Sequence, residues 1–295
     1  TFDGAELLTW QEASRRIPPV GVDAYKYERG VVEIRAGSVG SSGAARIAAR
    51  GAQAAGAGIV RLVVDEDLYP VLAPSAGGIM VVPEKNNGAS SGGGGREAES
   101  PKEERFRPDA VLLGPGWGRS AQRLPALRAA LDREAEGTPL ILDADAIALS
   151  RGMTFHGKAI LTPHPGEFAA FTGLPQETVL ANTLPILTDL ARKIRAVILF
   201  KSHVLIIADE DGRVGIVDGM APVLAAGGSG DLLAGLCAAI AARMKRRGCY
   251  DGYTCAAAAA ALLAETGRAP EMARRFMDPL DLAEKAASLA GKAWL

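Results

Sequence analysis

Aromatic residues, cysteines and excess charge of either sign are all scarce in this chain of 295 residues. Aromatics make up 5% of the residues, whereas glycine and alanine are abundant, which favours a tightly packed parallel sheet over a sandwich with an aromatic core. A formal net charge of -1 provides no electrostatic footprint for nucleic acid or an anionic membrane. We therefore expect a small-molecule partner, no nucleic acid and no membrane.

The cysteines and the hydropathy exclude further classes of protein. Cys237, Cys249 and Cys255 are odd in number and lack CxxC spacing, which argues against a disulfide framework and against a zinc site. No signal peptide is visible, and no uninterrupted apolar stretch reaches ~18 residues. These absences predict a protein of the reducing cytoplasm. A homo-oligomer is also expected.

Strand and helix patterns alternate along most of the chain, which is long enough for one large α/β domain or two small ones. We expect strands that end in turns within residues 30–37, 110–116, 138–146 and 158–167. Residues 44–64 are expected to form a helix that leads into another strand. Residues 196–217 predict two strands in a hairpin with its turn at Asp-Glu-Asp-Gly, and residues 228–295 predict helices. This order indicates a mostly parallel sheet between two helical layers, with ligands beyond the carboxyl ends of the strands.

Two segments depart from the alternation. Residues 1–24 contain a short helix stopped by two prolines and predict a linker or cap before the main domain at residues 25–295. Residues 83–109 are rich in glycine and serine and then in charge, which predicts a flexible solvated insertion. A mobile lid is the functional alternative for that insertion.

A glycine loop precedes the first long helix of the carboxyl-terminal part. Gly228, Ser229 and Gly230 come directly before Asp231 and an apolar helical run. The N–H groups of a helix N-terminus attract an anion, and glycines let a phosphate come close to the backbone there. An acid at that position could serve as the general base of a phosphoryl transfer. The alternative is that Ser229 or Asp231 merely caps the helix. The loop by itself leaves the two interpretations open.

A histidine held between two prolines follows the strand expected at 158–167. His164 ends this strand and Glu167 begins the next helix. Glu167 could stabilise the helix through its dipole, or it could hold a hydrated Mg²⁺ beside phosphates. The two other histidines, His156 and His203, are expected to be structural or on the surface.

Three further strand ends carry candidate residues. The turn with Gly114, Gly116 and Gly118 allows a ligand to approach the backbone, or it is a plain turn packed by Trp117. Asp143 and Asp145 are expected to face one cleft because alternate strand positions share a side, with a single buried acid as the alternative. Lys201 could meet a phosphate as a point charge or lie in solvent.

Taken in this order, the motifs resemble those of the ADP- or ATP-dependent NAD(P)H-hydrate dehydratases of the ribokinase-like superfamily. The match extends from about residue 25 to residue 289 and includes Lys26, Gly30 and the stretches AQAAGAGIVRLVV, GPGWG, DADAIALS, TPHPGEFAAFTG and GGSGDLLAG. Each motif is weak alone, but the ordered set is specific. The resemblance implies a ribokinase-like three-layer α/β/α fold.

The resemblance also implies an activity and its cofactors. Hydrated NADH or NADPH would be phosphorylated on its ring hydroxyl by ADP or ATP with Mg²⁺, and loss of phosphate would restore the nicotinamide. Asp231 would be the base, with the N–H groups of Gly228, Ser229 and Gly230 as the anion hole. The remaining implied roles are substrate binding for Ser38, Gly114, Gly116, Gly118 and His164, nucleotide binding for Lys201, and Mg²⁺-bound water for Glu167 and Asp143, with no direct protein ligand to the metal.

The chain also departs from the family pattern. Ala221, Val223 and Ala226 stand where the family has Asn, Gly and Thr before the glycine loop, and Ser202 replaces a glycine after Lys201. Two alternatives therefore stay open: a small-molecule alcohol kinase of the same superfamily, and a non-catalytic nucleotide-binding protein. The stretch LLTWQEASRRIPPV resembles the linker to the epimerase domain of bifunctional members, so a missing N-terminal epimerase domain is expected.

Overall fold

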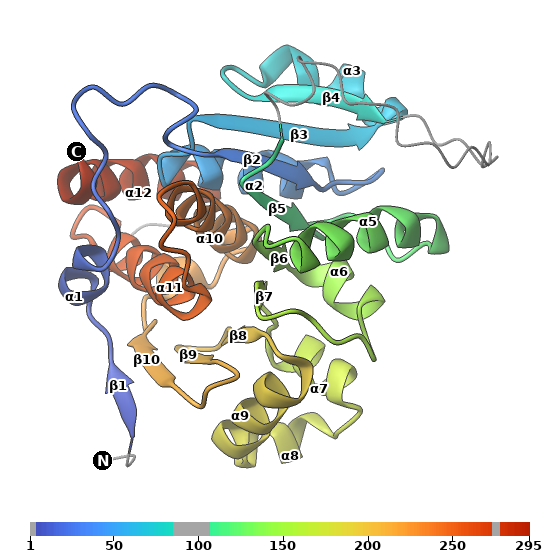
Figure 1. Ribbon diagram of the computed structural model, residues 1–295, viewed down its shortest axis with the longest axis vertical. Helices are drawn as coiled ribbons and strands as arrows, with labels where there is room; N and C mark the ends of the chain where they lie inside the picture. The colour runs from blue at the N-terminus through green and yellow to red at the C-terminus, as the bar shows by residue number, and fades with distance from the viewer. Residues whose placement is uncertain (1–3, 85–106, 273–277) are drawn as a thin grey trace.

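The computed structural model describes residues 4–84, 107–272 and 278–295, and these contain a ten-stranded sheet at the centre of three layers (Figure 1). The strand order is β1-β10-β9-β8-β7-β6-β5-β2-β3-β4, and only β9 runs antiparallel to its neighbours. The strands are β1 Ala5–Leu7, β2 Val31–Arg35, β3 Ile59–Asp65, β4 Met80–Glu84, β5 Ala110–Leu113, β6 Leu140–Leu142, β7 Ala159–Leu161, β8 Val197–Phe200, β9 Val204–Ala208 and β10 Val214–Asp218. The predicted mostly parallel α/β fold is confirmed.

Helices cover both faces of this sheet because its inner strands are apolar on both sides. One core packs α2 Ser42–Ala54, α10 Ser229–Arg246, α11 Gly252–Arg268 and α12 Pro279–Trp294 against one face. The other core includes α5 Leu124–Ala135, α6 Ala144–Leu149, α7 Pro165–Thr172 and α9 Thr183–Ile194, with α8 Gln176–Ala181 beside them. Along β5, for example, Leu112 faces the first core and Val111 and Leu113 face the second.

The α2–α10 crossing depends on glycines. A Cβ atom on Gly235 of α10 would lie 2.0 Å from the Ala48 carbonyl oxygen of α2, and one on Gly51 would lie 2.5 Å from the Leu232 oxygen. Only glycine lets the two backbones come this close. Cys237, on the same helix, is fully buried, as expected of a core residue. This crossing places the N-terminus of α10 at the edge of the sheet where the strands end.

The segment 196–217 differs from its prediction. It forms three strands, β8, β9 and β10, rather than two, because Lys201, Ser202 and His203 make a turn directly after β8. Lys201 lies at a strand end, as expected. The Ser202 hydroxyl closes that turn by donating to the Val204 carbonyl oxygen at 2.6 Å. The predicted turn at Asp-Glu-Asp-Gly does connect β9 to β10.

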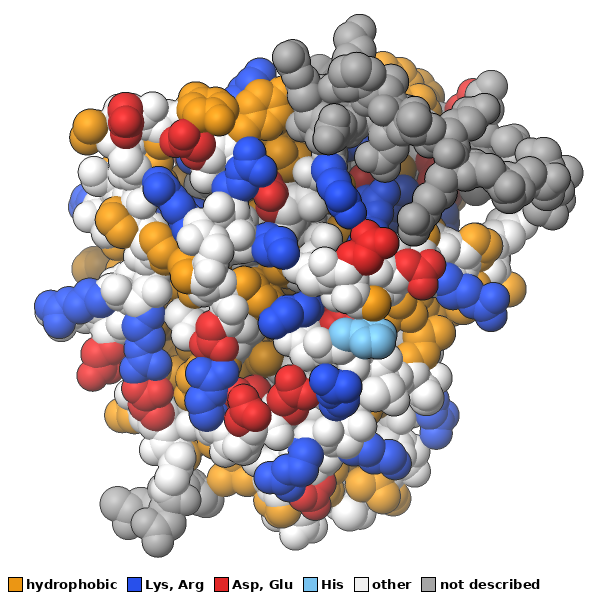
Figure 2. All heavy atoms as spheres, in the orientation of Figure 1, with side chains coloured by type: hydrophobic (Ala, Val, Ile, Leu, Met, Phe, Trp, Pro, Cys, Tyr) orange, Lys and Arg blue, Asp and Glu red, His pale blue; other side chains and the backbone are white. Residues whose placement is uncertain are grey.

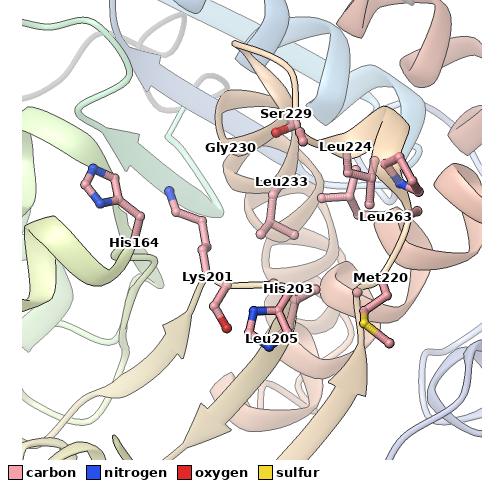
Figure 3. Close-up of a pocket in the computed structure, with 15 residues that line it drawn as sticks. His164, Lys201, His203, Leu205, Met220, Leu224, Ser229, Gly230, Leu233 and Leu263 are labelled. Atoms are coloured by element: carbon pink, nitrogen blue, oxygen red, sulfur yellow. The ribbon is translucent and has the colours of Figure 1, made fainter. Parts of the chain in front are cut away.

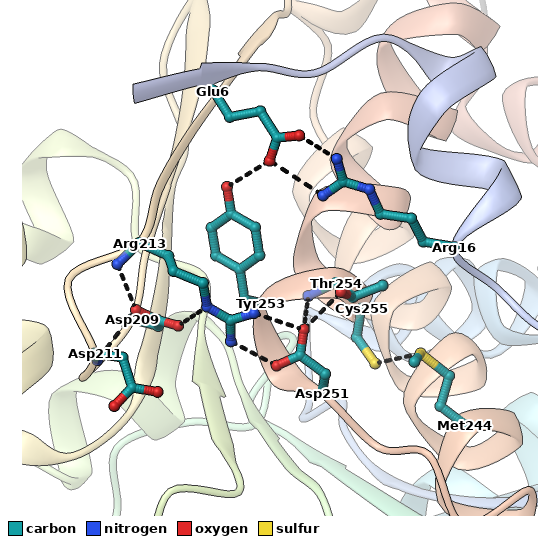
Figure 4. A network of polar contacts seen from close by, with 10 residues as sticks. All are labelled: Glu6, Arg16, Asp209, Asp211, Arg213, Met244, Asp251, Tyr253, Thr254 and Cys255. Carbon is teal, nitrogen blue, oxygen red and sulfur yellow. Dashed lines mark hydrogen bonds and ion pairs between the residues drawn. The ribbon is translucent and has the colours of Figure 1, made fainter. Parts of the chain in front are cut away.

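The amino-terminal residues join the sheet. β1 pairs with β10 at one edge, and α1 Trp10–Arg15 packs against α11. A polar network continues this contact (Figure 4): Glu6 pairs with Arg16 and accepts from the Tyr253 hydroxyl, and Arg213 lies over the Tyr253 ring. The segment expected as a linker or cap therefore contributes a strand and a helix. Most of the predicted insertion at 83–109 lies outside the described residues.

Charges of both signs are interspersed over the face of the molecule that Figure 2 shows, as the formal net charge of -1 suggests. None of the described helices is both long and apolar enough to cross a membrane.

Candidate active site

The candidate residues lie where five neighbouring parallel strands end. Ser38 follows β2, the glycine turn follows β5, Asp143 follows β6, His164 follows β7 and Lys201 follows β8. The N-terminus of α10 reaches the same edge, because a Cβ on Gly230 would lie 3.2 Å from Lys201 Nζ. The fold thus brings together motifs that are distant in sequence, as expected for a doubly wound sheet.

A cavity of about 780 Å³ opens at this edge (Figure 3). Of the predicted site residues, His164, Lys201, Ser229 and Gly230 line it, and the opposite wall is apolar, formed by Leu205, Met220, Leu224, Leu233 and Leu263. A cavity with a polar end and an apolar wall suits a ligand that is anionic at one end and has a flat apolar group at the other.

Sequence reasoning missed part of this lining. His203, expected to be structural or on the surface, lines the cavity together with Met220. The available signal was the position of His203 just after Lys201, because the turn that follows a strand end at this edge of the sheet brings His203 to the cavity as well. The substitutions before the glycine loop also differ in position: Ala221 and Val223 are both buried in the core, but only Ala221 of the two also lines the cavity.

The N-terminus of α10 is open rather than capped by a side chain. Gly228 is the N-cap residue with φ +97°, and a Cβ there would lie 2.7 Å from Ile47 Cδ1, so glycine is required on both counts. Within the described residues, neither Ser229 nor Asp231 accepts a capping hydrogen bond through its side chain. The Ser229 N–H donates to the Ala226 carbonyl oxygen at 3.3 Å, which leaves Gly228 and Gly230 as the better-placed donors of the predicted anion hole.

Lys201 is held by a buried acid. Its Nζ lies 2.5 Å from Asp143 Oδ1, and the Thr162 hydroxyl donates to the same oxygen at 2.6 Å. Asp143 and Thr162 are buried, and the Lys201 side chain is 15% exposed. Burial alone would lower the pKa of Lys201, but the charges of Asp143, Glu167 and Asp231 outweigh it and raise that pKa. Lys201 therefore stays a cation beside the helix N-terminus.

Asp231 is electrostatically prepared to accept a proton. Burial and the negative charge of Asp143 raise its pKa to about 7, with Glu167 acting in the same direction and Lys201 opposing them. A carboxyl group with that pKa changes protonation state near neutral pH, which suits a general base. Its place beside the open helix N-terminus is the arrangement that phosphoryl transfer to a hydroxyl requires.

His164 and Glu167 cap α7 reciprocally. The His164 Nδ1 accepts from the N–H groups of Gly166 and Glu167, and a Glu167 carboxylate oxygen accepts from the His164 N–H at 2.9 Å. Because Nδ1 is an acceptor, a neutral imidazole carries its proton on Nε2. The dipole-stabilising role considered for Glu167 is thus present, and His164 still lines the cavity.

The glycine turn after β5 packs against its neighbours rather than lining the cavity. A Cβ on Gly114 would lie 1.8 Å from the Asp143 carbonyl oxygen, and one on Gly116 would lie 2.8 Å from Ser41 Cβ. Gly118 lies near Ser38, and Trp117 is buried. This group therefore forms a second part of the site, next to Asp143 but separate from the cavity lining.

Asp143 and Asp145 do not face one cleft as predicted. Strand β6 ends at Leu142, Asp143 is the N-cap residue of α6 and Asp145 lies in the first turn of that helix, so strand periodicity does not apply. Asp143 contacts Lys201, whereas Asp145 accepts from the Gly118 N–H at 2.8 Å. Asp143 is therefore already engaged by a lysine, which weighs against the role in binding Mg²⁺-bound water that the resemblance implied.

The model of the NAD(P)H-hydrate dehydratase family matches residues 32–287 of this chain. The chain belongs to that family. The family assignment confirms the resemblance drawn from the ordered motifs, and the family's name states the class of enzyme that those motifs predicted. The chain spans about half the length of the first curated relatives it matches, which are bifunctional NAD(P)H-hydrate repair enzymes.

Individual relatives agree with this assignment. The chain is 31% identical over 229 residues to the ADP-dependent (S)-NAD(P)H-hydrate dehydratase of Bacillus subtilis, which covers 77% of this chain and 78% of that protein. A ribokinase-like superfamily protein from Enterococcus faecalis superimposes with a TM-score of 0.81 at 24% identity, covering 99% and 98% of the two chains. The B. subtilis ADP/ATP-dependent NAD(P)H-hydrate dehydratase, co-crystallised with ATP and Mg²⁺, has a TM-score of 0.78 at 22% identity, covering 98% and 99%. These structures confirm the predicted ribokinase-like fold.

Proposed function

We propose that this chain uses ADP or ATP to dehydrate hydrated NADH or NADPH, with Asp231 as the general base. The observation that carries the proposal is the position of Asp231, whose pKa is raised to about 7, in the first turn of α10 and beside Lys201. The names of the relatives, among them an ADP-dependent dehydratase, support the substrate and the phosphoryl donor.

The reaction is a phosphoryl transfer followed by an elimination. Asp231 takes the proton of the ring hydroxyl, whose oxygen bonds to the terminal phosphorus of the nucleotide while the bond to the leaving nucleotide breaks. The C–O bond then breaks, phosphate leaves with its electron pair, and loss of a ring proton restores the double bond. The N–H groups of Gly228 and Gly230 and the ammonium of Lys201 would stabilise the charge of the transferring phosphoryl.

Two ligands are assigned to two parts of the site. The cavity with the apolar wall would hold the nucleotide, with its phosphates toward Lys201 and Gly230. The hydrated nicotinamide would approach from Ser38 and the glycine turn, on the other side of Asp143. Asp231 would act on the substrate hydroxyl between them.

The residues present suit a hydrated Mg²⁺ rather than a directly ligated one. Among the described residues, no group of three or more His, Cys, Asp or Glu side chains is placed to hold a metal ion. Three carboxylates surround the single cation of Lys201, and this excess of negative charge favours a cation that keeps its water shell. Glu167 would accept from that shell, and Mg²⁺ bound to the phosphates would neutralise charge during transfer.

An assay with hydrated NADH, Mg²⁺ and either ADP or ATP tests the proposal. We expect the absorbance of reduced nicotinamide to return with the wild-type chain and not with Asp231→Asn, while both proteins bind nucleotide. Nucleotide consumption only with another alcohol would establish a kinase instead. Nucleotide binding without any turnover would establish a non-catalytic protein. The homo-oligomeric state and the cytoplasmic location stay predictions.

A further inference from the structure

The two acids of the Asp143-Ala144-Asp145 turn reach in different directions. Asp143 contacts Lys201 and Thr162, on the side of the nucleotide cavity. Asp145 contacts Gly118 and Arg119, on the side of the glycine turn. The three residues therefore connect the two parts of the site through one short segment at the start of α6.

The backbone between the acids is in an unusual conformation. Ala144 has φ +46°, one of two non-glycine residues with positive φ in the described chain. An L-residue with a Cβ rarely adopts this region unless its surroundings hold it there. The left-handed turn at Ala144 interrupts the regular geometry that would otherwise relate the two side chains.

Each acid is bound tightly enough to hold its loop. Asp143 is 1% exposed and its Oδ1 accepts from both Lys201 and the Thr162 hydroxyl. Asp145 accepts from the Gly118 N–H at 2.8 Å through one oxygen and from Arg119 Nε at 2.8 Å through the other. A carboxylate that accepts a backbone N–H fixes the loop itself, because the amide cannot move without the chain.

We propose that Asp143 and Asp145 are positioning residues, in which Asp143 holds Lys201 toward the N-terminus of α10 and Asp145 holds the Gly114–Gly118 turn that receives the substrate. Neither acid touches the reacting atoms. Because both lie on one turn, they fix the spacing between the phosphoryl donor and the acceptor hydroxyl, and such spacing strongly affects rate. The inference rests on the proposed function for the identity of the two ligands.

The Asp145 contact is tested by hydrogen exchange at the Gly118 amide. We expect Asp145→Ala to accelerate that exchange at least tenfold and to raise KM for hydrated NADH about tenfold, with little change in nucleotide Kd. Asp145→Asn keeps an oxygen that can accept from Gly118 and should restore most of the protection and of KM. Equal effects of Ala and Asn on both measurements would overturn the assignment.

The Asp143 contact is tested by separating rate from affinity. Asp143→Asn removes the carboxylate that neutralises and positions the Lys201 ammonium. Because Lys201 is then less precisely positioned, we expect kcat to fall about tenfold or more. Because its positive charge is no longer neutralised, we expect the nucleotide Kd to stay unchanged or to decrease. Thr162→Val, which removes only the supporting hydroxyl, should act in the same direction and more weakly. A parallel loss of kcat and nucleotide affinity in both variants would indicate general loosening of the site and would overturn the proposal.

Two measurements keep the inference separate from the proposed function. Asp143→Asn should leave Gly118 exchange unchanged, and Asp145→Ala should leave the stability coupling between residues 143 and 201 unchanged. The coupling is measured by thermal unfolding. Lys201→Met should lower Tm by several degrees, because it leaves the buried Asp143 without its cation, and adding Asp143→Asn to that variant should recover most of the lost Tm. If wild-type chain lacks dehydratase activity, the proposed function fails, whereas absence of both structural effects overturns the positioning roles.

Discussion

At the scale of single residues, Asp231 is the proposed general base. Burial makes the largest contribution to its raised pKa. Asp143 and Glu167 raise that pKa further and Lys201 lowers it, and the net result is a pKa of about 7. A base must be ionised to accept a proton, so its protonated fraction limits the rate at acidic pH.

The first prediction concerns the pH dependence of turnover. We expect kcat/KM for hydrated NADH to rise with pH up to about 7 and then level off, because Asp231 loses its proton in that range. Steady-state rates between pH 5 and 9 check this. A rate that is independent of pH across that range would exclude Asp231 as the base.

The second prediction concerns stability at the same residue. The pKa of Asp231 is higher in the folded than in the unfolded chain, so the folded state binds more protons and loses stability as pH rises from about 4 to 7. Asp231→Asn removes this penalty and should raise the free energy of unfolding at pH 8 by about 1–3 kcal/mol. Urea unfolding at pH 8 and at about pH 4 checks it, since the gain should largely vanish at about pH 4, where Asp231 is protonated in the unfolded chain as well.

At the scale of elements, the crossing of α2 and α10 determines where the N-terminus of α10, the proposed phosphate-binding end, lies. The two helices come close because Gly51 and Gly235 have no side chain at the contact. The position of Gly228 at the same end of α10, between Ile47 and Pro279, extends this packing to the loop itself. This packing places the positive end of the α10 helix dipole at the candidate site.

The third prediction tests that crossing. Gly235→Ala places a Cβ 2.0 Å from the Ala48 carbonyl oxygen, so the helices must separate, and we expect a loss of about 2–4 kcal/mol in the free energy of unfolding. Gly43→Ala is the matched control, because a Cβ there meets nothing within 4 Å. The control should be neutral or slightly stabilising. Similar unfolding midpoints for the two variants would contradict the packing argument.

At the scale of the whole molecule, a polar network joins the edge of the sheet to α11 (Figure 4). Arg213 lies between Asp209 of the β9–β10 hairpin and Asp251, which caps α11 through Thr254. Burial would raise the pKa of Asp251, but hydrogen bonds from Arg213 and Thr254 outweigh it and hold that pKa below its usual value. The network connects β1, the hairpin and α11 into one unit.

The fourth prediction removes the centre of this network. Arg213→Met leaves the buried Asp209 without its cation, so we expect a loss of about 1–3 kcal/mol in stability at pH 7. The loss should shrink as pH falls below about 4, through the depressed pKa of Asp251, because the protonated carboxyl no longer pairs with Arg213. Arg192→Met breaks only the exposed pair with Asp189 and should cost less than about 0.5 kcal/mol. Thermal unfolding at both pH values distinguishes the two variants.

Much of the fold followed from local pattern. Apolar strands alternating with alanine-rich helices predict a parallel sheet, and the structure has one, with β2, β5, β6, β7 and β8 beginning or ending near the expected residues. The predicted number of strands in residues 196–217 was wrong, because a turn at Lys201-Ser202-His203 divides the apolar run. The predicted common orientation of Asp143 and Asp145 was wrong, because a helix begins at Ala144. The pattern of apolar residues does not show where such a short strand ends and the next element begins.

The amino-acid sequence was enough to predict the order of the motifs and therefore the family, the layer architecture and the strand ends at which the proposed site lies. Only the tertiary structure decided that Asp143 and Asp145 diverge, that His203 and Met220 form part of a cavity wall, and that β1 completes the sheet. The reason is physical: periodicity depends on neighbours along the chain, whereas burial, charge coupling and backbone strain depend on groups brought together from separate strands. The pKa of Asp231 is the clearest case, because every charge that shifts it comes from another element.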